Sequence, residues 1–598
     1  MTGRSSFSPA SFSGSLPGDV PLGRDLRGLV RNPLDLGEDS VWICRDREDL
    51  RYSDGPAVER YLERVLRRST DLSSSSTELE QWIRDWPTEY HLSRKRSQLL
   101  RAFEFSRQSN VLEVGCGCGA ITRFLGETFE DVVAVEGSLK RARLARLRTR
   151  GMENVALLCA PFQEVEFVAP FDLVFCIGVL EYSGTFINNA NPYRTALQRL
   201  SESLTPEGVL VLAIENQFGL KYLCSSTEDH SGVMFDGWEG YPTSGNRVRT
   251  FGYHELRDLM NEFFPTVDCY FPYPDYKTPS SILAESFFRK ARVGELVGSF
   301  RSRDYHKRSR PLFDERFAVS ELDRNGMLPM FANSFLILAG KSHSRSVRFP
   351  YLGVKYSTDR VPSFQTVTHF IETDDGTIRV HKSLANKTSS TTVGHLTLHS
   401  TESDWVPQLS LQGDIIRRVK ERDLSLEELL RPCRLWLRKL TDLGTTDGEC
   451  TTVEGRFLDA NWSNSYIQHG QCLFVDLEWE WHERIPVHVI LIRNIFAMLQ
   501  EIGPLSGVNP LLRRGTTRAI IERAARAIGV RVTAPDFRAF CHLEAELAHD
   551  AFGRSRRWTT IALALTLRGR WILFAGSLVR QAAERLLRRI ASIGQRVW

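Results

Sequence analysis

Two carboxylate side chains flank a run of glycines near the middle of the N-terminal half. The segment Val111 to Leu125, VLEVGCGCGAITRFL, places Glu113 just before Gly115, and Glu136 ends the next apolar run, VVAVE. Glycines allow the backbone to approach a ligand closely, and the N–H groups that open a helix attract polar or negative groups. A carboxylate at the end of the second strand can accept hydrogen bonds from ribose hydroxyls. These residue types in this order predict a site for a nucleoside ligand.

Alternating strand and helix patterns position these residues. Five apolar, β-branched runs are separated by enough residues for crossover helices: NVLEVG, DVVAVE, NVALLC, FDLVFCIG and GVLVLAIE. This alternation predicts an α/β fold with a parallel, doubly wound, Rossmann-like sheet. Two later apolar runs, Thr266 to Phe271 and Phe331 to Lys341, supply the last two strands of a seven-stranded sheet. The region between these two runs is an insertion that could shape a second binding pocket.

The order of these features resembles the class I S-adenosylmethionine-dependent methyltransferases. Some other Rossmann protein stays an alternative, because the glycine pattern also satisfies the NAD fingerprint. The resemblance implies S-adenosyl-L-methionine (SAM) as cofactor. It also implies that Glu113 orients the methionine end and Glu136 holds the ribose, with Gly115, Gly117 and Gly119 forming the loop.

One position departs from that family pattern. Pro161 stands where many of these methyltransferases carry an aspartate that accepts the adenine amino group. We therefore expect Phe162 and backbone groups to contact the adenine. Cys116 and Cys118 are interpreted as small packing residues, since methyl transfer from a sulfonium needs no covalent intermediate.

Further stretches resemble bacterial methyltransferases associated with lipopolysaccharide and other surface glycans, including O-antigen chain-terminating methyltransferase-kinases. The main matches are Trp86 to Arg101, Glu228 to Pro242 and Phe271 to Leu283. The resemblance implies methyl transfer to a hydroxyl or phosphate of a cell-surface glycan or its lipid-linked precursor. It also implies other glycan-assembly enzymes as partners.

Methyl transfer to a hydroxyl requires a group that accepts its proton. The candidates are His230, Asp229 and Glu181, with His91 as a further titratable residue. His230 is the first choice, because it lies in a polar loop after the fifth strand, where loops meet the carboxyl ends of a parallel sheet. A purely structural role for His230, as a hydrogen-bonding group within its loop, stays open. We predict no metal site, since the cysteines form no paired framework with metal-ligand spacing.

A dilute protein-kinase pattern occupies the region between residues 366 and 476. Lys382 ends a predicted hairpin, Asp459 and Asn464 have the spacing of a kinase catalytic loop, and Asp476 ends a later strand as a second metal ligand would. No glycine-rich loop precedes them, and Phe457 replaces the usual histidine. Three interpretations stay open: an active kinase that uses Mg²⁺ and ATP, a degenerate structural or ligand-binding module, and coincidence. These departures favour the degenerate module.

These patterns divide the 598 residues into four predicted units. They are a flexible, partly helical leader (1–82) with one helix near residues 57–67, a methyltransferase domain (83–343), an α+β kinase-like domain (350–505) and a helical basic tail (506–598). The tail combines arginine clusters with apolar runs after residue 554. It is interpreted either as helices on an anionic membrane surface or as a helix packed on the protein's own core.

Composition limits the cellular setting. A net charge of +4 is small for a chain of this length and does not indicate a dedicated nucleic-acid-binding module. We therefore expect no nucleic-acid partner. Scattered cysteines and an N-terminus without a secretory pattern predict a cytoplasmic protein, with the tail as a peripheral contact on the inner face of the membrane. Two other functions stay as alternatives, an RNA methyltransferase and a catalytically silent scaffold of a glycan-assembly complex. The scaffold is disfavoured because the glycines and both carboxylates are intact.

Overall fold

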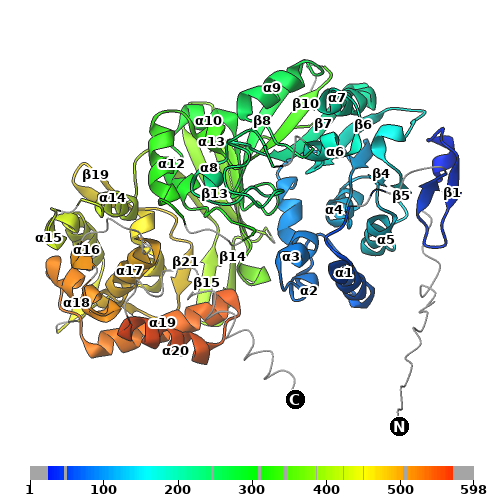
Figure 1. Cartoon of the computed structure of the whole chain (residues 1–598). Helices are drawn as coiled ribbons and strands as arrows, with labels where there is room; N and C mark the ends of the chain where they lie inside the picture. The colour runs from blue at the N-terminus through cyan, green and yellow to red at the C-terminus, as the bar shows by residue number, and fades with distance from the viewer. Residues whose placement is uncertain are drawn as a thin grey trace, which may run out of the picture.

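A single mixed sheet of fourteen strands organises the molecule (Figure 1). The computed structural model describes residues 24–45, 50, 52–243, 247–306, 311–342, 347–385, 387–421, 423–448, 450–502, 510–512 and 514–569. The N-terminal strands lie at one side of the molecule in Figure 1, and the C-terminal helices gather at the lower left.

Seven neighbouring strands form the predicted Rossmann-like part of the sheet. In spatial order they are β5 (Val155–Cys159), β4 (Asp131–Glu136), β3 (Asn110–Val114), β6 (Phe171–Ile177), β7 (Leu204–Glu215), β10 (Ser334–Gly340) and β8 (Thr266–Tyr273). The five strands predicted to be parallel, β3 to β7, are parallel, and β10 runs antiparallel to both β7 and β8. The chain leaves β8, passes through the insertion and returns between β7 and β8 from the opposite end.

Alternation along the inner strands separates two apolar layers. Val132 and Ala134 of β4 belong to one buried cluster, whereas Val133 and Val135 belong to the other. Successive side chains of a strand point to opposite faces, so each layer needs its own helices. The first layer contains α4 (Ala120–Thr128) and α5 (Leu139–Arg148), and the second contains α7 (Pro192–Glu202) and α9 (Tyr253–Asn261).

In the described part of the predicted leader, residues 24–45, 50 and 52–82, strands and helices add to the fold. β1 (Leu34–Leu36) pairs with β2 (Trp42–Cys44), and β2 pairs in parallel with β5, which extends the sheet. The predicted helix is α1 (Pro56–Arg68). Burial of apolar side chains stabilises this segment against the rest of the fold, because Leu26, Val41 and Leu62 are fully buried. Residues 1–23 lie outside the described part of the chain.

Short helices lie between the leader and β3, after β6 and β7, and in the insertion. They are α2 (Thr77–Glu80), α3 (Trp86–Leu92), α6 (Ser183–Phe186), α8 (Leu220–Leu223), α10 (Glu285–Lys290), α11 (Gly294–Gly298), α12 (Glu315–Arg324) and α13 (Leu328–Phe331).

The sheet continues across the predicted boundary between the second and third units. β9 (Ser281–Ala284) pairs with β8 on one side and with β11 (Gly353–Ser357) on the other. β12 (Thr366–Glu372), β13 (Ile378–Leu384) and β16 (Thr401–Asp404) follow in antiparallel order. The two predicted domains therefore share one sheet, and the domain boundaries stay predictions.

Three small sheets and a helical layer complete the C-terminal part. The sheets consist of β14 (Ser390–Val393), β15 (Leu396–His399) and β21 (Trp479–Trp481); β17 (Thr445–Asp447), β18 (Cys450–Val453) and β22 (Ile485–Pro486); and β19 (Ser465–Gln468) and β20 (Gln471–Phe474). The helices are α14 (Leu411–Arg418), α15 (Leu426–Leu429), α16 (Cys433–Asp442), α17 (Val487–Ile502), α18 (Thr517–Ala527), α19 (Ala534–Phe552) and α20 (Arg556–Arg568). Trp436 and Trp462 are fully buried among them.

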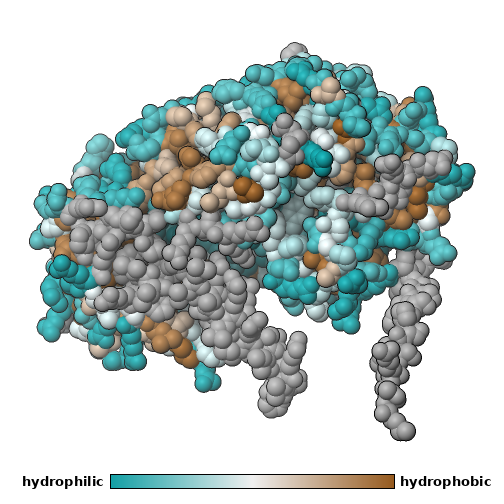
Figure 2. Space-filling model, viewed as in Figure 1, coloured by the Kyte–Doolittle hydropathy of each residue, from teal (hydrophilic) through white to brown (hydrophobic). Residues whose placement is uncertain are grey.

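Helix α20, in the predicted tail, has one buried face and one exposed face. Leu567 is buried in the same cluster as residues of α18 and α19, whereas Trp558, Ile561 and Leu565 are exposed. Among the described residues, no helix has the length and apolar character needed to cross a bilayer. The surface drawn in Figure 2 is mainly hydrophilic, with apolar patches, one of them near the lower edge where Figure 1 shows α19 and α20. The remainder of the predicted helix pair, residues 570–598, lies outside the described part of the chain.

Candidate active site

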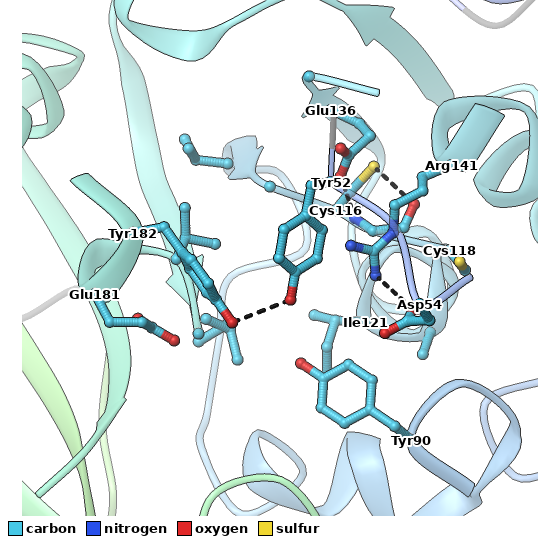
Figure 3. Close-up of a pocket in the computed structure, with 18 of the residues that line it drawn as sticks. Tyr52, Asp54, Tyr90, Cys116, Cys118, Ile121, Glu136, Arg141, Glu181 and Tyr182 are labelled. Atoms are coloured by element: carbon cyan, nitrogen blue, oxygen red, sulfur yellow. Dashed lines mark hydrogen bonds and ion pairs between the residues drawn. The ribbon is translucent and has the colours of Figure 1, made fainter. Parts of the chain in front are cut away.

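A cavity of about 320 Å³ opens where the carboxyl ends of β3, β4, β6 and β7 meet. The glycine loop and Glu136 line one side, and Glu181, Asp229 and His230 line another. Figure 3 shows Glu136 and Glu181 on opposite sides of this cavity, with Tyr52 between them. All the predicted cofactor and catalytic residues except Gly119 therefore line one cavity, although they come from distant parts of the sequence.

Steric limits explain the glycine loop between β3 and α4. Gly119 precedes α4 with φ of 83°, a left-handed conformation that side chains disfavour. A Cβ atom at Gly119 would lie 2.8 Å from Cα of Ala145 in α5. Glycine thus lets α4 and α5 pack closely and keeps the loop, including the pocket-lining Gly115 and Gly117, at the cavity wall.

Glu136 is tied to this loop. Its Oε2 accepts the backbone N–H of Gly117 at 2.8 Å, and its Oε1 accepts the N–H of Ser138 at 3.0 Å. Each carboxylate oxygen has two lone pairs, so one on each atom is still available to a ligand. This arrangement suits two neighbouring ribose hydroxyls.

Glu113 presents an unsatisfied negative group to the same cavity. The residue is 3% exposed, and its Oε2 has no hydrogen-bond partner among the described residues. Burial raises the pKa of Glu113 to about 7. An uncompensated buried carboxylate is costly, and a cationic ligand group such as the ammonium of SAM would relieve that cost. Phe162 also lines the cavity, as expected for an adenine contact.

Several pocket residues come from segments in which the sequence patterns predict no site. His91 Nε2 lies 2.9 Å from Asp54 Oδ2, and Arg141 Nη2 lies 3.4 Å from the same oxygen. The hydroxyl groups of Tyr52 and Tyr182 form a hydrogen bond of 3.0 Å. Asp54 and Tyr52 belong to the N-terminal segment, where no motif marks them. His91 is the only one of these residues that sequence analysis names.

Asp229, one of the predicted bases, lies beside two lysines. Its Oδ2 lies 2.8 Å from Lys221 Nζ and also contacts Lys277 Nζ. Burial alone would raise the pKa of Asp229, but the two lysines outweigh it and hold that pKa far below the usual range. A carboxylate stabilised in this way has little tendency to accept a proton.

His230 faces two buried carboxylates. Its Nδ1 lies 2.9 Å from Glu228 Oε1, while its Nε2 lies 3.8 Å from Glu181 Oε1 and 3.9 Å from Glu215 Oε2. Burial disfavours the imidazolium, but the carboxylates of Glu215, Glu181 and Glu228 outweigh burial and raise the pKa of His230 well above its usual value. The raised pKa favours the imidazolium form of His230, which cannot accept a further proton.

Sequence analysis does not name Glu215, which ends β7 and is fully buried. The sequence does contain a signal for Glu215, because it ends the fifth predicted strand and ligands bind at the carboxyl ends of the strands in such sheets. Glu181 follows β6 in the same way, and burial raises its pKa. The catalytic and cofactor roles of all these residues stay predictions.

The four kinase-like residues also come together, in a separate site beside β13. Lys382 Nζ contacts Asp476 Oδ2 and lies 3.2 Å from Glu478 Oε1. Asn464 Nδ2 donates to the carbonyl oxygen of Asp459 at 3.2 Å. Arg360, in the loop between β11 and β12, contacts Glu478 at 2.7 Å.

Electrostatics distinguishes the carboxylates of this second site. Burial, together with the charges of Glu478 and Asp476, raises the pKa of Asp459 well above its usual value. Burial also opposes ionisation of Glu478, but Lys382 and Arg360 outweigh it and lower that pKa. The two cations and the two carboxylates, Asp476 and Glu478, therefore neutralise one another.

Comparisons with known proteins match the first site. Residues 112–210 match a family model described as a methyltransferase domain. Malonyl-[acyl-carrier protein] O-methyltransferase of Priestia megaterium is 25% identical over 111 residues, which are 18% of this chain and 38% of that protein. The chain thus spans about two fifths of the length of this curated relative. The family-model match runs from within β3 to within β7, so the chain carries a methyltransferase domain with a Rossmann-like sheet.

Solved structures give broader likenesses. The N-methyltransferase NodS from Bradyrhizobium japonicum, in complex with S-adenosyl-L-homocysteine, is 21% identical over 27% of this chain and 74% of its own, with a TM-score of 0.19. Phospholethanolamine N-methyltransferase 2 of Haemonchus contortus is 14% identical over 48% of this chain and 61% of its own, with a TM-score of 0.28.

Proposed function

We propose that the protein is a SAM-dependent methyltransferase that methylates an oxygen of a cell-surface glycan or its lipid-linked precursor. The observation that carries the proposal is one cavity that joins the glycine loop and two carboxylates to a separate wall of polar residues. In this arrangement Glu136 holds the ribose, Glu113 holds the ammonium of the methionine end and Phe162 contacts the adenine. When bound, SAM would supply an activated methyl group on its sulfonium sulfur, and transfer of this group to an acceptor oxygen would release S-adenosyl-L-homocysteine.

The opposite wall suits a polar, hydroxylated acceptor. It is lined by Asp229, His230, Lys277 and Tyr305, and Lys277 Nζ contacts the carboxylates of Asp229 and Glu215. Tyr and His rings around the cavity offer flat faces that can pack against a sugar. These features support a hydroxyl acceptor, whereas the phosphate acceptor and the surface-glycan class rest on the sequence resemblance.

The acceptor class is tested by incubating the full-length protein with SAM labelled in its methyl group and separate acceptor fractions. The fractions are a lipid-linked glycan extract, free polysaccharide and total RNA. We expect label in a glycan fraction as an alkali-stable ether, or as a methyl ester of phosphate. Label confined to RNA would support the RNA methyltransferase instead. Binding of SAM without transfer to any fraction would support the silent scaffold.

We further propose that residues 350–505 form a degenerate kinase-like module. Convergence of Lys382, Asp459, Asn464 and Asp476 supports a kinase-like arrangement. The loop between β11 and β12, where a phosphate-binding loop is expected, contains no glycine, and its Arg360 pairs with Glu478. The internal pairing of the charges disfavours binding of Mg²⁺ and ATP.

We propose that the open face of α20 contacts an anionic membrane surface. Trp558, Ile561 and Leu565 are 37%, 38% and 57% exposed and lie along one side of the helix at spacings of three and four residues. Exposed arginines at positions 557 and 568 flank this apolar stripe. An apolar stripe with flanking positive charge is typical of helices that lie in the headgroup region.

A further inference from the structure

A cluster of three possible metal ligands lies in the wall of the cavity. Glu181, Glu215 and His230 each offer one ligand atom, and these atoms lie within 4.8 Å of one another. Each ligand comes from a different loop or strand end, at the carboxyl end of the central sheet. Sequence analysis predicts no metal site, because these three residues are far apart in the chain and have no motif spacing.

The carboxylates of this cluster have buried oxygens that no protein group satisfies. Glu181 is 1% exposed and Glu215 is fully buried, and Oε2 of each has no hydrogen-bond partner among the described residues. The other oxygen of Glu215, Oε1, contacts Lys277 Nζ at 2.5 Å and accepts the hydroxyl of Tyr276 at 3.3 Å. Glu215 is thus held by one oxygen while the second is directed toward His230.

The imidazole of His230 is oriented as a ligand. Glu228 accepts the backbone N–H of His230 through Oε2 at 2.7 Å, and its Oε1 lies 2.9 Å from Nδ1. A proton on Nδ1 that is donated to Glu228 leaves the lone pair on Nε2, directed at Glu181 and Glu215. Histidines that bind metals commonly have a carboxylate on the second nitrogen, which sets the tautomer and the ring orientation.

The distances favour an ion over a direct hydrogen bond. Nε2 of His230 lies 3.8 and 3.9 Å from the nearest oxygens of Glu181 and Glu215, too far for a hydrogen bond. Ligand atoms that share one metal at about 2.1 Å lie roughly 3–4 Å apart. One ion between the three groups would satisfy all of them.

The charge balance leaves room for a cation. The connected groups are five carboxyl groups (Glu181, Glu215, Glu228, Asp229 and Asp275) and two lysines (Lys221 and Lys277), together with His230. Both lysines contact Asp229, Lys277 also reaches Glu215, and Lys221 also reaches Asp275. With His230 neutral and the carboxyl groups ionised, the group carries three uncompensated negative charges, of which a divalent ion would neutralise two.

We infer that Glu181, Glu215 and His230 bind a divalent transition-metal ion, such as Mn²⁺ or Zn²⁺. The mixture of two oxygen donors and one imidazole suits these ions, and three protein ligands leave positions for other oxygens. The role of the ion rests on the proposed methyltransferase function. An acceptor hydroxyl bound through its oxygen would lose its proton to water more readily, with the electron pair left on that oxygen. The site then needs neither Asp229 nor His230 as a base.

The test measures metal binding directly, on the full-length protein after treatment with a chelator. Titration with Mn²⁺, followed by the loss of the free-ion electron paramagnetic resonance signal, should give one ion per chain. Co²⁺ should give a visible absorption band from protein coordination. We expect His230→Ala, Glu215→Gln and Glu181→Gln each to weaken Mn²⁺ binding more than tenfold. Glu228→Gln should weaken it roughly 10–100-fold, because it frees the histidine ring.

Matched controls separate this site from general effects. His254→Ala and Glu239→Gln remove the same side-chain types at exposed positions outside the cavity and should bind Mn²⁺ like the wild type. The inference is overturned if the wild type binds no Mn²⁺, Co²⁺ or Zn²⁺, a measurement that does not depend on any variant folding. It is also overturned if Glu215→Gln and His230→Ala bind Mn²⁺ as tightly as the controls.

Cofactor binding, measured on the same samples by calorimetry, distinguishes failure of the inference from failure of the proposed function. A protein that binds SAM but no metal retains the methyltransferase proposal and rejects the metal site. A protein that binds one Mn²⁺ through these residues but no SAM retains the metal site and rejects the methyltransferase proposal.

Discussion

The carboxylate of Glu136 accepts the backbone N–H of Gly117, which joins the end of β4 to the glycine loop that follows β3. The contact orders two elements of the proposed cofactor site at once. It also fixes the orientation of the carboxylate before a ligand arrives, and such preorganisation lowers the entropic cost of binding.

We predict that Glu136→Ala weakens SAM binding more than tenfold. Hydrogen bonds that involve a charged group are worth roughly 1.5–3 kcal/mol, and about 1.4 kcal/mol corresponds to a tenfold change in Kd. Isothermal titration calorimetry measures the effect. Glu130→Ala, an exposed glutamate just before the same strand, serves as the control. Unchanged affinity in Glu136→Ala would reject the ribose role.

We predict that SAM binds more tightly as the pH rises from 6 to 7.5. The free protein holds Glu113 with a pKa of about 7, because burial disfavours the carboxylate, and the ionised form is the one that pairs with the ammonium. Since the ionised fraction increases with pH, the apparent Kd should fall roughly eightfold over this interval. Glu113→Gln should bind weakly and lose this dependence. An equally steep dependence in Glu113→Gln would assign the titration to another group.

We predict that ATP binding to the second site is weak or absent, with or without Mg²⁺. Lys382 is already paired with Asp476 and Glu478, and Arg360 with Glu478, so the nucleotide would have to displace internal ion pairs. Calorimetry with and without Mg²⁺ measures this. Methyltransferase activity should survive Asp459→Ala. Tight, Mg²⁺-dependent binding that Asp476→Asn abolishes, together with phosphorylation of a glycan end, would instead establish an active kinase.

We predict that the protein sediments with vesicles that contain anionic phosphatidylglycerol, and does so less at high salt. Serine at the three exposed positions of α20 (Trp558, Ile561 and Leu565) should abolish sedimentation, because these side chains form the open apolar stripe. Deletion of residues 554–598 should have the same effect without loss of SAM binding. Serine at exposed Leu312, an apolar residue far from α20 in the sequence, is the control. Equal sedimentation of the triple variant would show that α20 is not the contact.

Local sequence patterns predict the part of the fold that is built from short strands and helices close together in the chain. Periodicity located β3, β4, β5, β6 and β7, and the apolar runs near residues 266 and 331 became β8 and β10. The glycine loop with Glu113 and Glu136 could be recognised for the same reason. A strand, a tight turn and a helix N-terminus are set by residues close together in the chain.

The side of the cavity that carries Asp229 and His230 could not be predicted from the sequence, because tertiary contacts determine its chemistry. Asp229 carries the side chain of a possible base, but Lys221 and Lys277 lie beside it, and nothing in the sequence indicates that Lys277 reaches Asp229. Similarly, Glu215 and His230 look unrelated in the chain. A pKa and a ligand set depend on distances of a few ångströms between side chains, and only the packed sheet determines those distances.

The sequence alone determined that this protein has a strand, a glycine loop and a helix with two suitably spaced carboxylates, because those features are local. Tertiary structure decided that residues 24–45 and 52–82 extend the fold, that one sheet joins both predicted domains, and that Glu181, Glu215 and His230 meet. Those outcomes depend on which apolar surfaces pack together over long separations, and burial against a distant partner leaves no periodic signal in the chain.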